Sequence, residues 1–425
     1  MNYCILLLFI ASSALVNSQR CTEKCFCDTR SRRLHVSCRR LVDADLKDIV
    51  AAVKEDFHSL YIEDSEFVHF DAAILKPMKN LNSLWVTKSK LGRISTKAFE
   101  QLPHLRNLAF SNSNLNKIDE YFAANSSVIE LYLSGNQIES IHENAFSGLN
   151  NLVRLDLTDN QLKSLPNGLF SYQNGLHSLK QLFLQRNQLS QIDTIFAGNS
   201  TMVHLSLAEN KIASLHENSF FGLSKLEWLD LRSNQLTALP RNVFSIQKGL
   251  RSLKKVNLVA NEFSEINANF ISGSTLEELK LSLNRISRVH QDAFSGLNNL
   301  TIISFQRNHL ESLPRNLFSL HKGLKEVDLS FNWFTEIHAN FLTSQSLVYL
   351  SLEDNVISRI DANAFPVEAN PLLADLSLAF NQIESIPKKV FENAYDSFNL
   401  SENPVVCGEE KSSFRLLPFV VAYCF

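Results

Sequence analysis

The sequence predicts an α/β solenoid, a coil of short turns with a parallel β-sheet on its concave face and irregular or 3-10 structure on its convex side. The main observation is the stretch LEWLDLRSNQLTALPRNVF at residues 226–244, whose leucines, asparagine and phenylalanine recur at residues 152–170 and 300–318. Self-similarity with a period of roughly 20 to 29 residues is typical of a solenoid built from one short strand per turn.

One position in each turn marks the phase of the repeat. The chain bends after each strand, and a side-chain amide there can donate to and accept from backbone groups that the bend leaves unpaired. We therefore predict about fifteen turns, and less regular ones where serine replaces asparagine. The markers are Ser65, Ser89, Ser113, Asn136, Asn160, Asn187, Asn210, Asn234, Asn261, Asn284, Asn308, Asn332, Asn355, Asn381 and Asn403.

A block of three turns is also repeated. Asn160, Asn234 and Asn308 are spaced 74 residues apart, and Pro166, Pro240 and Pro314 each follow their marker by six residues. This longer period indicates that equivalent positions in successive blocks can be compared directly.

Side chains of a strand alternate between its two faces. In the stretch at residues 226–244, Leu229 and Leu231 are predicted to face the core. Trp228, Asp230 and Arg232 are then predicted to point out onto the concave face.

The Leu, Asn and Phe frame resembles the extracellular leucine-rich repeat family over residues 21–424. The resemblance implies a leucine-rich repeat horseshoe, and the phenylalanine-rich turns are similar to Toll, Slit and chaoptin-type ectodomains, as in an arthropod-like secreted protein. Such solenoids serve many functions, so the resemblance is specific for fold and not for function.

The N-terminus is predicted to be a signal peptide. Residues 3–16 form a short apolar run, and residues 16–18 suit cleavage after Ser18. We therefore expect a secreted, extracellular protein with a signal peptide at 1–18, a disulfide-rich cap at 19–45, the repeats at 46–400 and a short C-terminal cap at 401–425.

The cysteines beyond the signal peptide lie only at the two ends of the chain. An even number of them in a secreted chain predicts disulfides, and the first four can pair in three ways. The segment at residues 21–38 resembles the N-terminal cap of the family, which implies the pairs Cys21–Cys27 and Cys25–Cys38. At the other end, Cys407 is predicted to pair with Cys424.

Two classes of partner are not expected. A formal net charge of −3 provides no general attraction to nucleic acid. The apolar tail at residues 414–425 is too short to cross a bilayer of about 30 Å as a helix, so we expect no membrane span.

No catalytic constellation is present, and we predict that the chain is not an enzyme and needs no cofactor or metal. The histidines His142, His216 and His290 share one phase, but they lie three turns apart. At roughly 4.8 Å per strand step they are about 14 Å from one another, too far to share an ion.

The candidate site is the concave face. Exposed Trp, Tyr and Arg dominate binding energy at interfaces, although exposed large residues can also merely cover a sheet. The predicted partner-binding residues are Tyr61, Trp85, Tyr132, Arg154, Asp156, Phe183, Trp228, Asp230, Arg232 and Tyr349.

Four N-glycosylation sequons are present, at Asn125, Asn199, Asn299 and Asn399. The first three fall just before the strand of their turn, so their glycans would line one edge of the solenoid. The opposite edge and the concave face would remain open for partners.

These features predict a secreted glycoprotein that binds a protein or glycan ligand through its concave face, in recognition, cell adhesion, extracellular matrix or innate immunity. The alternative is a non-catalytic structural or stabilising subunit of a secreted complex. The identity of the ligand and the oligomeric state are left open.

Overall fold

The computed structural model describes residues 18–28, 33–53, 57–94, 96–193, 196, 201–268, 270–271, 273–392, 395–404 and 420–421. The chain forms two compact units. Unit 1 comprises Met1–Leu189 and Ile195–Met202, and unit 2 comprises Ser190–Thr194 and Val203–Phe425. Each unit is described by itself.

Unit 1 begins with an antiparallel cap. Strand β2 (Cys25–Asp28) pairs with β1 (Ser18–Thr22) on one side and with β3 (His35–Arg39) on the other. Cys25 and Cys38 face each other in this register and form a disulfide, as the resemblance implied. Helix α1 (Asp45–Ala52), which the sequence did not predict, follows with Leu46 and Ile49 buried.

The other predicted disulfides stay predictions. Cys27 is disulfide-bonded, but the side chain of Cys21 lies outside the described residues. Cys407 and Cys424 also lie outside them.

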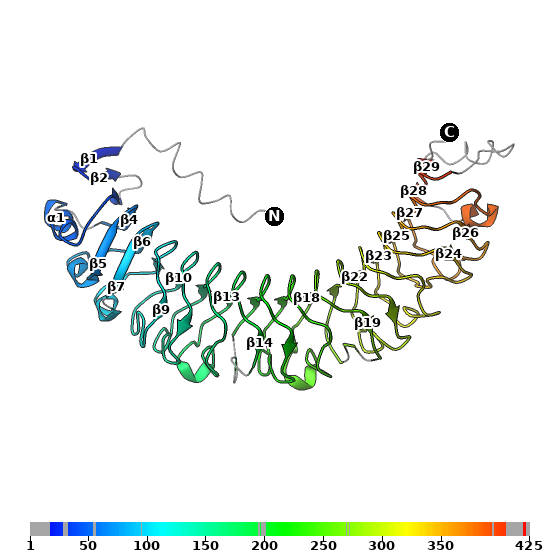
Figure 1. The fold of residues 1–425 in the computed structure, drawn as a ribbon, viewed down its shortest axis with the longest axis horizontal. Helices are drawn as coiled ribbons and strands as arrows, with labels where there is room; N and C mark the ends of the chain where they lie inside the picture. Colours follow the sequence, from blue (N-terminus) through cyan, green and yellow to red (C-terminus); the bar gives the residue numbers. More distant parts are fainter. Residues whose placement is uncertain are drawn as a thin grey trace. The chain divides into compact units, whose positions relative to one another are not determined.

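Strand β3 leads into a parallel sheet in unit 1, with one strand per turn (Figure 1). The pairings are in unbroken register, and the central leucines Leu84, Leu108 and Leu131 are fully buried. The strands are β4 (Ser59–Glu63), β6 (Ser83–Thr87), β8 (Asn107–Ala109), β10 (Glu130–Tyr132), β12 (Arg154–Asp156) and β13 (Gln181–Phe183).

Unit 2 continues the same design. Leu229 and Leu231 have no exposed surface, which confirms that they face the core. Its parallel strands are β15 (His204–Ser206), β17 (Trp228–Asp230), β18 (Lys255–Asn257), β20 (Glu278–Lys280), β22 (Ile302–Ser304), β23 (Glu326–Asp328), β25 (Tyr349–Ser351), β27 (Asp375–Ser377), β28 (Ser397–Asn399) and β29 (Val420–Val421).

The predicted fold class, a parallel solenoid with 3-10 structure on its convex side, is confirmed. One detail was wrong: the serine-marked turns are not less regular, because β4 and β6 have five residues each and pair throughout. The 3-10 segments are η2 (Ala72–Leu75), η3 (Thr96–Gln101), η4 (Tyr172–Asn174), η5 (Ile246–Lys248) and η6 (Lys388–Glu392).

The marker asparagines form a ladder of hydrogen bonds between turns. The Asn234 amide nitrogen donates to Leu207 O at 3.0 Å and to Leu231 O at 3.0 Å, and its oxygen accepts from Ile212 N at 3.0 Å. One buried side chain therefore satisfies backbone groups both in its own turn and in the preceding one. Where serine replaces asparagine, the hydroxyl makes fewer of these hydrogen bonds: Ser89 Oγ accepts from Ser65 N and donates to Thr87 O.

Short parallel pairs on the convex side were not predicted. In four of the five pairs given below, the residue six places after the marker donates its N–H across the turns, as from His142 N to Ile118 O at 2.9 Å. Proline at this position has no N–H, so the pairing stops there. The pairs are β5 (Glu66–Phe70) with β7 (Lys90–Ile94), β9 (Lys117–Ile118) with β11 (Ser140–Ile141), β14 (Gln191–Ile192) with β16 (Ser214–Leu215), β19 (Glu265–Ile266) with β21 (Arg288–Val289), and β24 (Glu336–Ile337) with β26 (Arg359–Ile360).

Phenylalanines fill the core behind the sheet. Phe146 stacks on Phe170 at 6.2 Å between ring centroids in unit 1, and Phe294 stacks on Phe318 at 6.0 Å in unit 2. Within the described ranges, no helical segment has the length and apolar character needed to cross a bilayer.

The asparagine ladder leads to a prediction for Asn234→Ala. The substitution leaves buried backbone groups in two turns without partners, so we expect the free energy of unfolding to fall by roughly 2–5 kcal/mol. Urea denaturation followed by circular dichroism measures the loss. Gln235→Ala, which trims the exposed neighbouring side chain, is the control and should change stability by less than about 0.5 kcal/mol. Equal effects of the two substitutions would contradict the role of the ladder.

Candidate functional site

The concave face of unit 1 carries its aromatic residues in one row. The strand register places Tyr61 beside Trp85, and Trp85 beside Ala109. Tyr132 follows on β10 and Phe183 on β13, with Asp156 between them. Two positions of the row therefore lack a ring.

The side chains close both gaps and form a continuous stack. Tyr61 and Trp85 stack at 6.4 Å between centroids, and Trp85 and Tyr132 at 5.3 Å with their planes only 28° apart. The Arg154 guanidinium then lies over both Tyr132 and Phe183, at 5.5 and 4.3 Å from their ring centroids. We call these five residues the aromatic ladder.

Ala109 makes the Trp85–Tyr132 contact possible. The two rings come from strands that lie on either side of β8, roughly 10 Å apart at the backbone. Ala109 occupies the position between them and is fully buried. Because its side chain is a single methyl group, the two rings can lean over it and meet.

Arg154 bridges the second gap because it is held from several sides. Its guanidinium donates to Gln181 Oε1 at 3.2 Å and lies 3.8 Å from the Asp156 carboxylate. Planar guanidinium groups stack well on aromatic faces, so the arginine completes the row in place of a ring.

Polar groups beside the ladder are only partly satisfied. Tyr132 donates its hydroxyl to Glu130 at 2.5 Å, and burial together with this hydrogen bond raises the pKa of Tyr132. In contrast, Arg154 Nε, Thr158 Oγ1 and Gln185 Oε1 are buried without a hydrogen-bond partner. Most buried polar groups in folded proteins are hydrogen-bonded, so these three atoms are exceptions within the aromatic ladder and its surroundings.

The predicted site residues of unit 2 do not form such a stack. Trp228 contacts His204 edge-on at 6.1 Å, and Arg232 pairs with Glu209 at 3.2 Å. Tyr349 lies on β25, which is separated from the β17 strand of Trp228 by four further strands of the sheet. The ten predicted residues are thus distributed over separate surfaces.

Asp230 corrects one prediction. It was expected to point out and meet a partner, but it is only 4% exposed. Its carboxylate accepts from Arg232 N and Arg232 Nε, both at 3.1 Å, and burial raises its pKa against these hydrogen bonds. Asp230 therefore holds Arg232 in place and is not open to a ligand.

A charged cluster next to Trp228 was not predicted. Lys255 and Lys280 pair with Glu278 at 2.6 and 2.8 Å. Burial favours the neutral acid, but the two lysines hold the pKa of Glu278 below its usual value. The sequence signal that could have predicted this cluster is the presence of Lys255 on β18 and of Glu278 and Lys280 on the neighbouring strand β20.

The sequons differ in accessibility. Asn125 and Asn299 are exposed, and Asn399 is partly buried, with its Oδ1 accepting from Ser401 N at 3.1 Å. Asn199 lies outside the described residues. Glycosylation of all four sites stays a prediction.

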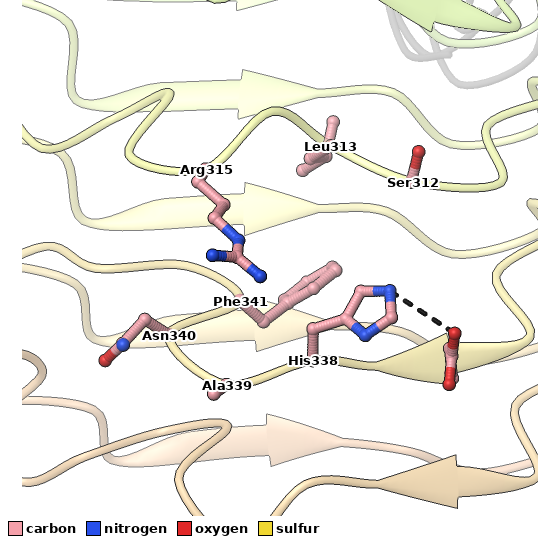
Figure 2. A pocket seen from close by; sticks show the side chains of 8 residues that line it. Ser312, Leu313, Arg315, His338, Ala339, Asn340 and Phe341 are labelled. Carbon is pink, nitrogen blue, oxygen red and sulfur yellow. Dashed lines mark ion pairs between the residues drawn. The ribbon is translucent and has the colours of Figure 1, made fainter.

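Two hollows of unit 2 lie away from the concave strands. Figure 2 shows one of about 260 Å³, which Arg315 and His338 line from adjacent turns, and the His338 ring is directed toward Glu336, with which it pairs at 3.4 Å. A hollow of about 120 Å³ occupies the equivalent place one block earlier, between Arg241 and Phe270. Because the hollow recurs, we attribute it to the junction between a turn that has a proline six residues after its marker and the next, shorter turn. Both volumes are below those of typical ligand pockets.

The phased histidines have a role in the turns. The Nδ1 atoms of His142, His216 and His290 each accept from the backbone N–H two residues later, at 3.1 Å. No cluster of three potential metal ligands occurs in the described part of the chain.

The role of Ala109 can be tested with Ala109→Leu. A larger side chain between the rings should separate Trp85 from Tyr132 and cost about 1–3 kcal/mol of stability through overpacking. In a Trp228→Phe/Trp333→Phe background, Trp85 is the single tryptophan, and its emission under selective tryptophan excitation should change when Leu replaces Ala109. Ala208→Leu, at a buried alanine outside the ladder, is the control for general overpacking. Unchanged Trp85 emission would show that the rings do not depend on Ala109.

Comparisons with known proteins agree with the repeat. A model described as "Leucine rich repeat" matches residues 103–162, 177–236, 251–310 and 274–334. The chain is 32% identical to lumican of Coturnix japonica over 244 residues, which cover 51% of this chain and 68% of lumican. It is 30% identical to Toll-like receptor 3 of Bos taurus over 302 residues, which cover 62% of this chain and 30% of the receptor.

Among solved structures, a leucine-rich repeat protein of Leptospira interrogans is similar with a TM-score of 0.65 and 24% identity. The match covers 82% of this chain and 91% of that protein, and it supports the fold alone. Together with the repeated frame and the asparagine ladder, these similarities show that the chain belongs to the extracellular leucine-rich repeat family.

Proposed function

We propose that this chain is a secreted, glycosylated binding protein that holds a protein ligand on the aromatic ladder of unit 1, in recognition or adhesion, including innate immune recognition. The observation that carries the proposal is the continuous stack of Tyr61, Trp85, Tyr132, Arg154 and Phe183. As a member of the leucine-rich repeat family, the chain is non-enzymatic.

The ladder has the properties of a binding hot spot. Tyrosine, tryptophan and arginine are the residue types that contribute most to interfaces. Each ring of the ladder is held by its neighbours, so these side chains lose little conformational freedom when a ligand binds. Tyr61 is 39% exposed, and Trp85 and Tyr132 are partly exposed, so the row is accessible as well as ordered.

The stacking favours a protein over a glycan. Sugar C–H groups pack against the electron-rich face of an aromatic ring. Tyr61 and Tyr132 cover the two faces of Trp85, and Arg154 lies over Tyr132 and Phe183. The ladder therefore presents mainly ring edges and polar tips, which suit the mixed surface of a protein.

The test is capture of a ligand from native extracellular fluid, followed by affinity measurements with variants. We expect Tyr61→Ala, Trp85→Ala and Tyr132→Ala each to weaken binding about tenfold or more, since hot-spot truncations typically cost over 1 kcal/mol.

Tyr349→Ala is the matched control. Tyr349 has the same 39% exposure as Tyr61 and also lies on a concave strand, but in unit 2 and outside the ladder. A ligand whose affinity falls with Tyr349→Ala and not with the ladder variants would place the site elsewhere. A protein that co-purifies in fixed ratio and binds independently of the ladder would instead support the alternative, a stabilising subunit of a secreted complex.

A further inference from the structure

A second exposed surface lies in unit 2, at the residues directly before and after the marker asparagines, where each strand has ended. We call the part of this surface between Leu283 and Phe380 the edge row. Trp333 is 50% exposed, and Leu283 and Phe380 are each 48% exposed. Five neighbouring turns contribute to the row, which is roughly 19 Å long at the strand spacing.

The internal repeat shows that the turn itself does not require these residues. The four positions that hold Arg307, His309, Phe331 and Trp333 in the third block can be read in the two earlier blocks. They are polar or small there, as expected for an exposed row in contact with water. The equivalents are Asp159, Gln161, Arg186 and Gln188, and then Ser233, Gln235, Ala260 and Glu262.

The backbone conformation at Phe331 and Phe380 is a second indication that the turn itself does not require these residues. Phe331 and Phe380 have φ angles of 56° and 54°, in the left-handed region. Glycine, asparagine and aspartate adopt this region at lower cost than aromatic residues. Two phenylalanines at such positions on an exposed edge are poorly explained by local folding and suggest a contact with another molecule.

The row is ordered by its own stacking. Trp333 and His309 stack at 4.3 Å between centroids with their planes 17° apart. The Arg307 guanidinium lies over the Phe331 ring at 4.4 Å. The surface is therefore formed before any partner arrives.

Two charged residues of the edge row, Arg307 and Asp354, indicate what kind of partner it binds. Arg307 lies one turn before Phe331 and Trp333, and Asp354 lies one turn after them. Opposite charges at such positions on adjacent turns can pair, as Asp159 and Arg186 do in unit 1. Arg307 and Asp354 are two turns apart, roughly 10 Å, and neither forms an ion pair among the interactions described for unit 2.

We propose that the edge row binds a second copy of this chain through a two-fold axis at the turn of Phe331 and Trp333. Such an axis brings each turn against the turn at the same distance on the other side of the centre. Arg307 of one copy then meets Asp354 of the other, and Leu283 meets Phe380. Both ionic groups gain partners, and the exposed apolar side chains cover one another.

A glycan at Asn299 would not obstruct this contact. Asn299 precedes strand β22 and is exposed, whereas the edge row follows the strands at their other ends. The edge row also lies in a different unit from the aromatic ladder, so ligand binding and self-association can fail independently.

The experiment uses the full chain from a secretory host in sedimentation equilibrium at about 1–100 μM. We expect a reversible monomer–dimer equilibrium in this range. Arg307→Asp places like charges against each other in the dimer, and so does Asp354→Arg. Each should weaken association about tenfold or more.

The two variants also provide a test of geometry. When they are mixed, the aspartate introduced at position 307 of one chain should meet the arginine introduced at position 354 of the other. The unchanged Asp354 of the first chain should likewise meet the unchanged Arg307 of the second, so the mixture should form a heterodimer although each variant alone is monomeric. Ser233→Asp, the equivalent substitution one block earlier, is the control and should leave dimerisation unchanged. Circular dichroism verifies that each variant is folded.

A wild-type chain that remains monomeric at about 100 μM, the top of the range in which we expect association, would overturn the proposal. Dimers that persist in both single variants, or a mixture of the two that stays monomeric, would overturn the two-fold arrangement at this row.

Discussion

The buried asparagine ladder is the interaction on which the rest of the structure depends. Each strand is short in most turns, and the chain must bend immediately afterwards, which leaves backbone groups inside the molecule without strand partners. An amide such as that of Asn234 satisfies them in two successive turns at once. This coupling keeps the strands in register, and the register decides which side chains meet on the surface.

The same backbone presents three different surfaces. On the concave face of unit 1, Ala109 and Arg154 join separate rings into one stack. On the concave face of unit 2, charged pairs such as Lys255–Glu278 lie among smaller polar residues. On the edge of unit 2, Trp333 and Phe380 stand exposed. Because turns contact mainly their neighbours, the exposed positions of one turn can change without disturbing the core of another.

The block repeat of 74 residues provides an internal reference for these differences. Positions that keep their residue type in every block, such as the buried leucines and phenylalanines, serve the fold. Buried positions stay apolar even where the residue changes, as from Leu157 and Leu231 to Phe305. The exposed positions change in character instead, from Gln161 and Gln235 to His309 and from Gln188 and Glu262 to Trp333. Turns with paired convex strands also alternate with turns that have none. Proline explains this difference, because Pro166 and Pro240 lack the N–H that His142 uses to pair convex strands.

The sequence alone determined the solenoid, the phase of its turns and the inward direction of residues such as Leu229, because these follow from local spacing and the two-residue period of a strand. It also indicated Trp85, Tyr132 and Arg154 as concave residues. Only the tertiary structure decided which of them touch, because contact depends on the neighbour on the next strand: Ala109 admits a ring pair, and Arg232 buries Asp230. The pairing of the convex strands and the stacking of Trp333 on His309 also depend on contacts between turns, which the spacing of residues along the chain does not show.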